Sequence, residues 1–360
     1  MSLNENERNI GQEYPLPNIS EQNLPQKVNI QQEKKDFTQQ EEEELNQWKS
    51  SNKLFGGTIY LVSGLYLLIA GIIFAIKNEE VIEYKVNYGI LDKCLNPSET
   101  SICEFILQIE QTMKQPIFVY YEMKNFNQNH QIYLESYDYS QLYSNSNDSL
   151  NSNRCKPFRT NMDLNEKFQK QINQNNPSKE IILKNLNGKI FQNSQLNDVA
   201  FPCGLRAFTI FNDEYKIYNS EVQKQNEIFV NSTNISWNYD KKYMKNLNTQ
   251  DYKDKQWLDL EDERVQNWMR PSGLSKFKKL WGRIEQNLQP GSYVVQVKNK
   301  YDSQFFDSQK SFIISTVNSI GGKNPVLVIS HLIAGSVSFL IGIVLVIYHF
   351  KYKFYKQNQY

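Results

Sequence analysis

The chain has 360 residues, with 40 Lys and Arg side chains against 39 Asp and Glu, so its formal net charge is +1. A balance this close to neutral, without a basic block, excludes the electrostatic signature of a nucleic-acid-binding protein. The length suggests about two or three domains. The mean hydropathy of −0.62 describes a polar chain, but it hides two long apolar segments.

Residues 1–53 are polar, contain several prolines and have few apolar side chains. Such a segment cannot bury enough apolar surface to fold alone, so we expect a disordered cytosolic tail. It also lacks the apolar stretch of a cleavable signal peptide. The first apolar segment is therefore expected to act as an uncleaved anchor.

Two segments, residues 54–76 and 326–350, are predicted to be transmembrane helices. The first segment contains no charged residue, and the only ionisable side chains of the second are two His and one Tyr. At 1.5 Å per residue each helix reaches roughly 35 Å, enough to cross a hydrocarbon core of about 30 Å. The alternative is a buried core helix, but runs of this length exceed the usual threshold for a membrane span. Residues 351–360 are expected to be a short basic and aromatic cytosolic tail.

Small residues form a stripe on each predicted helix. Small residues in such a stripe let another helix approach closely. Membrane helices depend on this close packing, because the hydrophobic effect does not drive their association in lipid. Glycine is also simply common in membrane helices, so the stripes are either incidental or docking faces, for each other or for a partner. The residues concerned are Gly57, Gly64 and Gly71 in the first helix, and Ala334, Gly335, Ser338 and Gly342 in the second.

Residues 77–325 are long enough to form a real core and are predicted to be the ectodomain. Runs of β-branched and aromatic residues predict strands at 117–121, 132–137, 207–211, 293–298 and 312–316. Apolar residues spaced three and four positions apart predict helices at 163–172 and 274–284. Strands that do not alternate with long helices favour an antiparallel sheet. Residues 140–200 are rich in Asn and Ser and are expected to be an extended insertion.

Cysteines and glycosylation sequons orient the chain better than its charges, because lysines flank both sides of the spans. The residues between the spans that suit an oxidising lumen are Cys94, Cys103, Cys155 and Cys203, with acceptor sequons at Asn147, Asn231 and Asn234. Both termini are then cytosolic, where a further sequon at Asn18 would be silent.

Four cysteines allow three pairings. We predict Cys94 with Cys103 and Cys155 with Cys203, which would stabilise by roughly 2.5 and 4 kcal/mol in the chain-entropy picture. Zinc binding is the alternative, but no pair has the short spacing of zinc ligands.

The sequence contains no motif of a catalytic or cofactor site. It has no Walker loop and no Gly-x-Ser-x-Gly elbow, and its three histidines form no metal-binding pair on a helix. The Asp-Lys-Thr-Gly signature of P-type pumps is absent as well. We therefore predict a non-enzyme without a cofactor or a metal.

Several ectodomain motifs, in order along the chain, resemble one family. They are Phe118-Val119-Tyr120-Tyr121 followed by Asn125-Phe126 and Asn129-His130, Pro202-Cys203-Gly204-Leu205 followed by Phe211-Asn212-Asp213, Trp268-Met269-Arg270 followed by Phe277 and Lys279-Leu280, Lys310-Ser311, and Gly321-Gly322-Lys323-Asn324. The chain resembles the ligand-effect-modulator family, the β subunits of type IV P-type ATPases, which are lipid flippases. Asn127, Gln131 and Pro271 depart from its pattern.

The resemblance implies an α+β membrane protein: two transmembrane helices and a large, mainly antiparallel-β, disulfide-bonded ectodomain with short helices. It implies a non-catalytic subunit that escorts the ATPase from the endoplasmic reticulum to the Golgi, endosome or plasma membrane and stays bound during phospholipid translocation. The stripe residues would face the partner. Lys323 and Asn324 would lie at the exoplasmic interface, near lipid headgroups or a pump loop. The motif aromatics are more readily interpreted as core residues than as contacts.

Two other classes fit the bare architecture. A two-span channel subunit usually needs more cysteines, and no polar pore stripe is evident. An adhesion or receptor glycoprotein would need a soluble ligand and no membrane partner.

Overall fold

The computed structural model describes residues 53–98, 100–143, 153–166, 183–219 and 226–358. The predicted disordered tail up to residue 52 and the acceptor Asn147 lie outside the described residues. So do residues 167–172 of the helix predicted at 163–172, whose described residues, 163–166, belong to a helix that begins at residue 161.

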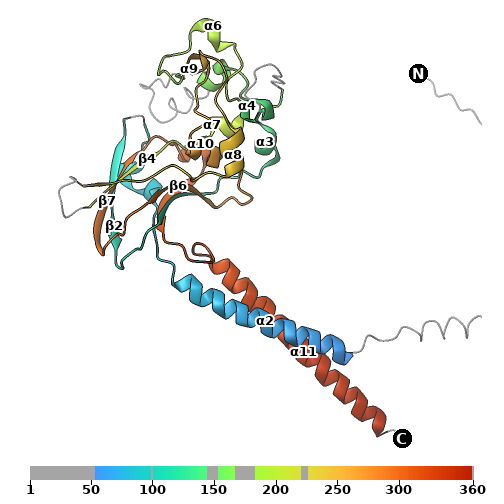
Figure 1. Ribbon diagram of the computed structural model, residues 1–360. Helices are drawn as coiled ribbons and strands as arrows, with labels where there is room; N and C mark the ends of the chain where they lie inside the picture. Colours follow the sequence, from blue (N-terminus) through green and yellow to red (C-terminus); the bar gives the residue numbers. More distant parts are fainter. Residues whose placement is uncertain (1–52, 99, 144–152, 167–182, 220–225, 359–360) are drawn as a thin grey trace, which may run out of the picture. The chain divides into compact units, whose positions relative to one another are not determined.

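Two long helices, α2 (Lys53–Glu79) and α11 (Pro325–Gln357), correspond to the predicted spans (Figure 1). Both are long and apolar enough to cross a membrane, and only 11% of each apolar stretch is buried. A core helix of a soluble domain would be mostly covered, so their exposure favours a lipid environment over the alternative interpretation.

The ectodomain between them is built on two antiparallel sheets of four strands (Figure 1). The first has the order β1 (Glu83–Val86), β8 (Gln309–Ser315), β3 (Ile117–Lys124) and β6 (Phe277–Ile284). The second has the order β2 (Ile102–Ile109), β7 (Gly291–Lys298), β4 (Glu214–Asn219) and β5 (Glu227–Ile228). The strands predicted at 117–121, 293–298 and 312–316 are confirmed as parts of β3, β7 and β8.

One large apolar core is shared by the two sheets. Alternate residues of each strand point into it, as the period of two requires. Phe105 of β2 and Tyr215 of β4 contact Phe312 of β8, with ring centroids 5.8 and 5.0 Å apart. The aromatic residues of one sheet thus pack on those of the other, as in a β-sandwich.

Two predicted strands are wrong. Residues 132–137 fall mainly in helix α3 (Gln131–Glu135), whose first turn is capped by the His130 ring nitrogen accepting from the Ile132 amide. Residues 207–211 overlap helix α7 (Leu205–Phe208). Short β-branched and aromatic runs do not determine a strand by themselves, and neither run finds a partner strand.

The helix predicted at 274–284 is also wrong, because this segment contains strand β6. Its apolar residues fit a spacing of three or four and a spacing of two equally well. Pairing along β3 decides between them, with a bulge between Val119 and Tyr120. Phe277 and Trp281 then point inward, and Lys278 points outward.

Short helices form a second layer of the ectodomain. They are α4 (Tyr139–Tyr143), α6 (Asn193–Leu196), α8 (Asn238–Tyr243), α9 (Tyr252–Lys255) and α10 (Glu263–Met269), with 3-10 turns η1 (Tyr88–Ile90), η2 (Asp92–Cys94) and η4 (Gln304–Phe306). Two smaller apolar clusters lie among them. The described parts of the predicted insertion, residues 140–200, contribute to both clusters.

Both disulfides have the pairing expected from the sequence, Cys94 with Cys103 and Cys155 with Cys203. The first joins η2 to β2, and the second lies in a small cluster with Phe158 and Phe208. All four cysteines are buried.

Candidate functional site: partner-facing surfaces and the core that supports them

The glycine stripe of α2 packs against α11 of the same chain. A Cβ atom at Gly64 would lie 2.6 Å from the backbone nitrogen of Phe339 and 3.0 Å from the carbonyl oxygen of Gly335. Gly57 faces the Val346 side chain, and Gly71 faces Leu332, at 2.8 Å in both cases. The small residues therefore let the two helices approach closely.

The stripe of α11 contributes unevenly to the same contact. Gly342 faces the backbone of Leu61, and Gly335 is buried. Ser338 is half-buried, whereas Ala334 is exposed. The glycines of both stripes therefore lie in the contact between the two helices. On α2 the exposed side chains include Phe55, Val62 and Tyr66.

Gly64→Ala is expected to destabilise this helix pair by about 1–3 kcal/mol, the usual cost of overpacking. The new methyl group would meet the Phe339 backbone, which cannot rotate away. Gly56→Ala is the matched control, because nothing lies within 4 Å of a Cβ at that position. The melting temperature of the full-length protein in mild detergent should fall for Gly64→Ala only. Equal melting temperatures for the two variants would contradict this packing.

The turn that leads into α11 uses Asn324 internally. Its side-chain oxygen caps the helix by accepting from the Leu327 amide at 3.1 Å, and its backbone amide donates to the Asn78 side chain at 2.8 Å. Gly321 has a φ of 116°, which supports the turn closed by Asn318. Lys323 is exposed beside it. Both residues predicted here are exposed, and Asn324 also caps the helix.

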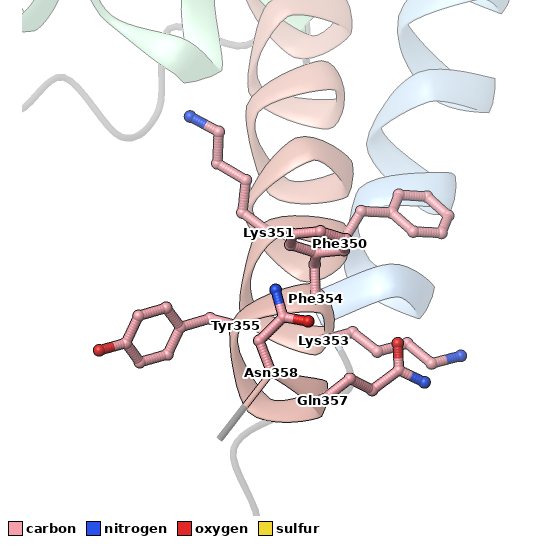
Figure 2. Close-up of a pocket in the computed structure, with 7 residues that line it drawn as sticks. All are labelled: Phe350, Lys351, Lys353, Phe354, Tyr355, Gln357 and Asn358. Carbon is pink, nitrogen blue, oxygen red and sulfur yellow. The ribbon is translucent and has the colours of Figure 1, made fainter. Parts of the chain in front are cut away.

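A shallow hollow surrounds the last turns of α11 (Figure 2). It is lined by Phe350, Lys351, Lys353, Phe354, Tyr355, Gln357 and Asn358. None of these residues was singled out as a candidate from the sequence, although the basic and aromatic composition of this tail was evident.

A buried ion pair holds the ectodomain core together. The Lys310 ammonium of β8 donates to Asp213 at 2.7 Å and to the Asn299 side chain at 2.6 Å. The other Asp213 oxygen accepts from the backbone amides of Lys300 and Tyr301, both at 2.7 Å. The side chains of Lys310 and Asp213 are 2% and 0% exposed.

This ion pair has the electrostatics expected of a buried site. The Tyr88 hydroxyl donates to Asp213 at 2.6 Å. Burial, with help from the Asp213 charge, raises the pKa of Tyr88 well above its ordinary value. Burial lowers the pKa of Lys310, and the Asp213 charge opposes this shift. The ammonium and the carboxylate of the pair are satisfied by each other and by these neighbouring groups, as in a structural ion pair.

The other family-like motifs also lie in the interior. Tyr121 stacks on Phe211 with ring centroids 3.8 Å apart. The Trp268 ring nitrogen donates to the Arg206 carbonyl at 2.9 Å. Gly204 has a φ of 97°, and a Cβ there would lie 2.3 Å from the Ser136 carbonyl oxygen, so only glycine fits. The interpretation of the motif aromatics as core residues is supported.

The buried Lys279 side chain is expected to make the stability of the ectodomain depend on pH. Burial and the charge of Arg270 lower its pKa to about 8, against about 10.4 in an unfolded chain. Between these values the unfolded state binds more protons, so stability should rise with pH, by about 2 kcal/mol between pH ~7.5 and ~9.5. Lys279→Met should flatten this rise, and Lys278→Met, at an exposed neighbour, should not. Denaturant unfolding across this pH range measures the slope, and identical slopes in both variants would refute the assignment.

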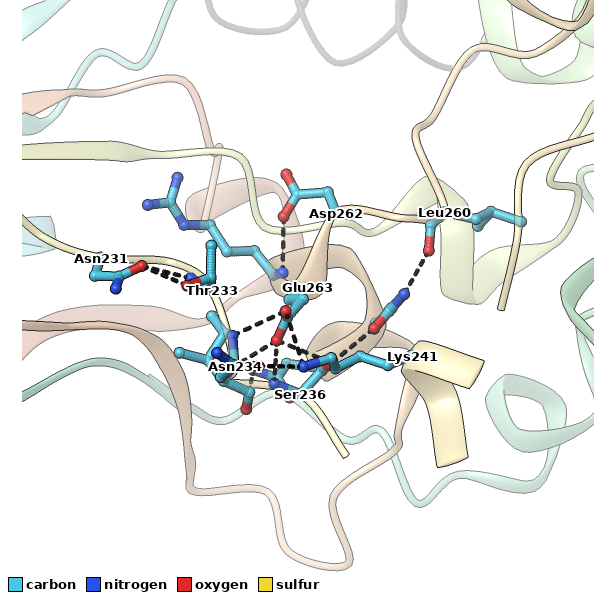
Figure 3. Close-up of polar contacts among 12 residues, drawn as sticks. Asn231, Thr233, Asn234, Ser236, Lys241, Leu260, Asp262 and Glu263 are labelled. Carbon is cyan, nitrogen blue, oxygen red and sulfur yellow. Dashed lines mark hydrogen bonds and ion pairs between the residues drawn. The ribbon is translucent and has the colours of Figure 1, made fainter. Parts of the chain in front are cut away.

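The two described sequons share one loop that a single carboxylate organises (Figure 3). Glu263 accepts from the backbone amides of Asn234, Ile235 and Ser236, at 2.9, 2.6 and 2.8 Å. Its partial burial raises the pKa of the carboxyl, but these donors together lower it below its ordinary value. Sequence reasoning missed Glu263, whose only local signal is its place in the first turn of α10.

The two acceptor asparagines differ in their contacts. Asn231 donates its side-chain nitrogen to Glu285 at 3.2 Å, and its oxygen accepts from Thr233. Asn234 is exposed, has a φ of 57°, and accepts from Lys241 through its oxygen. Asn234 is thus exposed, whereas Asn231 is half-buried.

The described residues contain no group of three His, Cys, Asp or Glu side chains that could hold a metal ion.

Comparison with known proteins identifies the family. Residues 77–354 match the family described as LEM3 (ligand-effect modulator 3) family / CDC50 family. Cell cycle control protein 50A of Mus musculus is 29% identical over 344 residues, which cover 83% of this chain and 85% of that protein. ALA-interacting subunit 3 of Arabidopsis thaliana is 27% identical over 309 residues, 79% of this chain and 77% of that protein.

A yeast relative has a more explicit name. Phospholipid-transporting ATPase accessory subunit CRF1 of Saccharomyces cerevisiae is 27% identical over 265 residues, which cover 68% of this chain and 58% of that protein. Since the family match covers both the ectodomain and most of α11, the chain belongs to the LEM3/CDC50 family.

Proposed function

We propose that this chain is the accessory β subunit of a phospholipid-transporting type IV P-type ATPase. The observation that carries the proposal is the family match over residues 77–354, together with the accessory-subunit name of the yeast relative. It favours this function over a channel subunit or an adhesion glycoprotein. Catalysis then takes place on the partner ATPase, and this chain supports its folding, exit from the endoplasmic reticulum and transport cycle.

The two parts of the chain each have internal contacts that suit a companion of a moving pump. Small residues bring α2 and α11 into close contact, and a buried ion pair joins distant segments of the ectodomain core. Such a subunit affects the transport cycle only if it contacts some pump conformations better than others. The surfaces available for this are the outer faces of the helices, the exposed turn at Lys323 and the ectodomain surface.

The topology follows as part of the proposal. The ectodomain lies in the lumen or outside the cell, where disulfides persist, and both termini lie in the cytosol. Asn147, Asn231 and Asn234 are then candidates for N-glycosylation. Removal of N-glycans by an endoglycosidase should increase the electrophoretic mobility of the wild type, and Asn→Gln variants should assign the shift.

Affinity purification of the full-length chain in mild detergent, followed by mass spectrometry, tests the function. A type IV P-type ATPase should co-purify in stoichiometric amount, and the chain expressed without its ATPase should stay in the endoplasmic reticulum. Stable delivery to the cell surface after deletion of every such ATPase gene would refute the proposal.

A further inference from the structure

Helix α11 continues past its apolar stretch as a basic and aromatic end. At 1.5 Å per residue its 33 residues span about 50 Å, whereas the hydrocarbon core is about 30 Å thick. The last turns therefore lie at the level of the lipid headgroups. Five aromatic side chains of this end are more than half exposed: Tyr348, Phe350, Tyr352, Phe354 and Tyr355.

The side chains around Phe354 are arranged as a clamp. At 100° per residue, Phe350 and Phe354 share one face of the helix, with Lys353 on one flank and Lys351 on the other. Figure 2 shows Phe354 in the centre, between Lys351 and Tyr355 on one side and Lys353 and Gln357 on the other. An apolar strip thus lies between two ammonium groups.

The opposite face of the same end carries a third cation. The Lys53 ammonium of α2 lies 4.2 Å from the centre of the Tyr348 ring and 5.8 Å from that of Tyr352. The stretches that make up this end, residues 53–60 and 348–358, contain no Asp or Glu. The end is therefore positively charged, and no described carboxylate of these stretches neutralises it.

We propose that this end of α11 binds an anionic phospholipid. The headgroup's phosphate and carboxylate lie between Lys351 and Lys353, over the Phe354 ring and within reach of the Gln357 and Asn358 amides. The acyl chain runs from there past Phe350 towards the apolar stretch of the helix. Charge complementarity selects this occupant, because basic residues next to a membrane span attract anionic lipids by about 1 kcal/mol each. A zwitterionic lipid lacks the net charge that the two lysines would complement.

The proposal is independent of the flippase function and can be tested on the full-length chain. The protein is reconstituted in nanodiscs of phosphatidylcholine with about 20% phosphatidylserine, released gently, and the retained lipids are counted by native mass spectrometry. Phosphatidylserine should be enriched over its share of the bilayer. In Lys351→Gln/Lys353→Gln the ratio of retained phosphatidylserine to retained phosphatidylcholine should fall about tenfold, after allowance for screening. Phe350→Ala/Phe354→Ala should lower the retention of any lipid.

The matched control is Lys114→Gln/Lys124→Gln, which removes two exposed lysines of the ectodomain. It should leave the enrichment unchanged, because the site lies at the Lys351 end. Loss of enrichment at high salt in the wild type would support the electrostatic mechanism. Equal enrichment in the two double-Gln variants, or no enrichment in the wild type, would overturn the proposal.

Discussion

Lys310→Met is expected to destabilise the ectodomain by about 3–5 kcal/mol, the usual cost of removing one partner of a buried ion pair. The Asp213 carboxylate would remain buried without a counter-charge, because its side chain is 0% exposed. It would keep the Tyr88 hydroxyl and two backbone amides as donors, but these groups do not neutralise a charge. Urea unfolding of the full-length protein in detergent, followed by tryptophan fluorescence, measures the loss.

The matched control is Lys298→Met. Its ammonium pairs with Glu214 at 2.8 Å, but both side chains are more than 40% exposed, so the pair should contribute at most about 1 kcal/mol. A double-mutant cycle with Asp213→Asn isolates the interaction from the loss of other Lys310 contacts. If Lys310→Met unfolds no more readily than Lys298→Met, the ion pair does not have the structural role assigned to it. A variant that accumulates only as misfolded protein would agree with the expectation.

The sequence predicted those elements whose signal is local and strong. The two spans are long apolar runs that no short helix of a soluble domain matches. Strands β3, β7 and β8 are dense in β-branched and aromatic residues and are bounded by Pro116, Pro290 and Asn318, so their local preferences agree with their final pairing. The same agreement explains why the family motifs could be read in order along the chain.

The elements that were missed depend on distant contacts. Strand β6 was predicted as a helix because its apolar spacing fits both periods, and only pairing with β3, more than 150 residues earlier in the chain, selects the strand. Helix α7 owes its position to Gly204, which lies against the Ser136 backbone. The sequence around residues 204–208 contains no pattern that predicts this contact.

The candidate site shows the same division. The glycine stripes were recognised from their spacing, but only the distance between Gly64 and the Phe339 backbone decides that they serve contact within the chain. The Asp213 and Lys310 pair joins residues 97 positions apart, so neither residue alone predicted it. The clamp around Phe354 was not predicted, because residues 351–360 were expected to be only a short basic and aromatic cytosolic tail.

Removal of the Cys155–Cys203 disulfide is expected to have the second large effect on the stability of the ectodomain. Cys155→Ala/Cys203→Ala should destabilise the ectodomain by about 4 kcal/mol in the chain-entropy picture, given a sequence separation of 48. Alanine avoids burying a hydroxyl group in the apolar cluster around Phe158 and Phe208. The Cys94–Cys103 disulfide, with a separation of 9, is the comparison, and its removal should cost about 2.5 kcal/mol.

The two losses should also differ in where the ectodomain opens. Cys155 and Cys203 belong to the small cluster, whereas Cys94 and Cys103 belong to the core shared by the sheets. Limited proteolysis followed by mass spectrometry should therefore find new cleavage between residues 153 and 208 in the first variant, with β3, β7 and β8 still protected. In the second variant new cleavage should begin near β2. Loss of protection throughout the ectodomain in the first variant would show that the small cluster and the sheets unfold as one cooperative unit, contrary to this expectation.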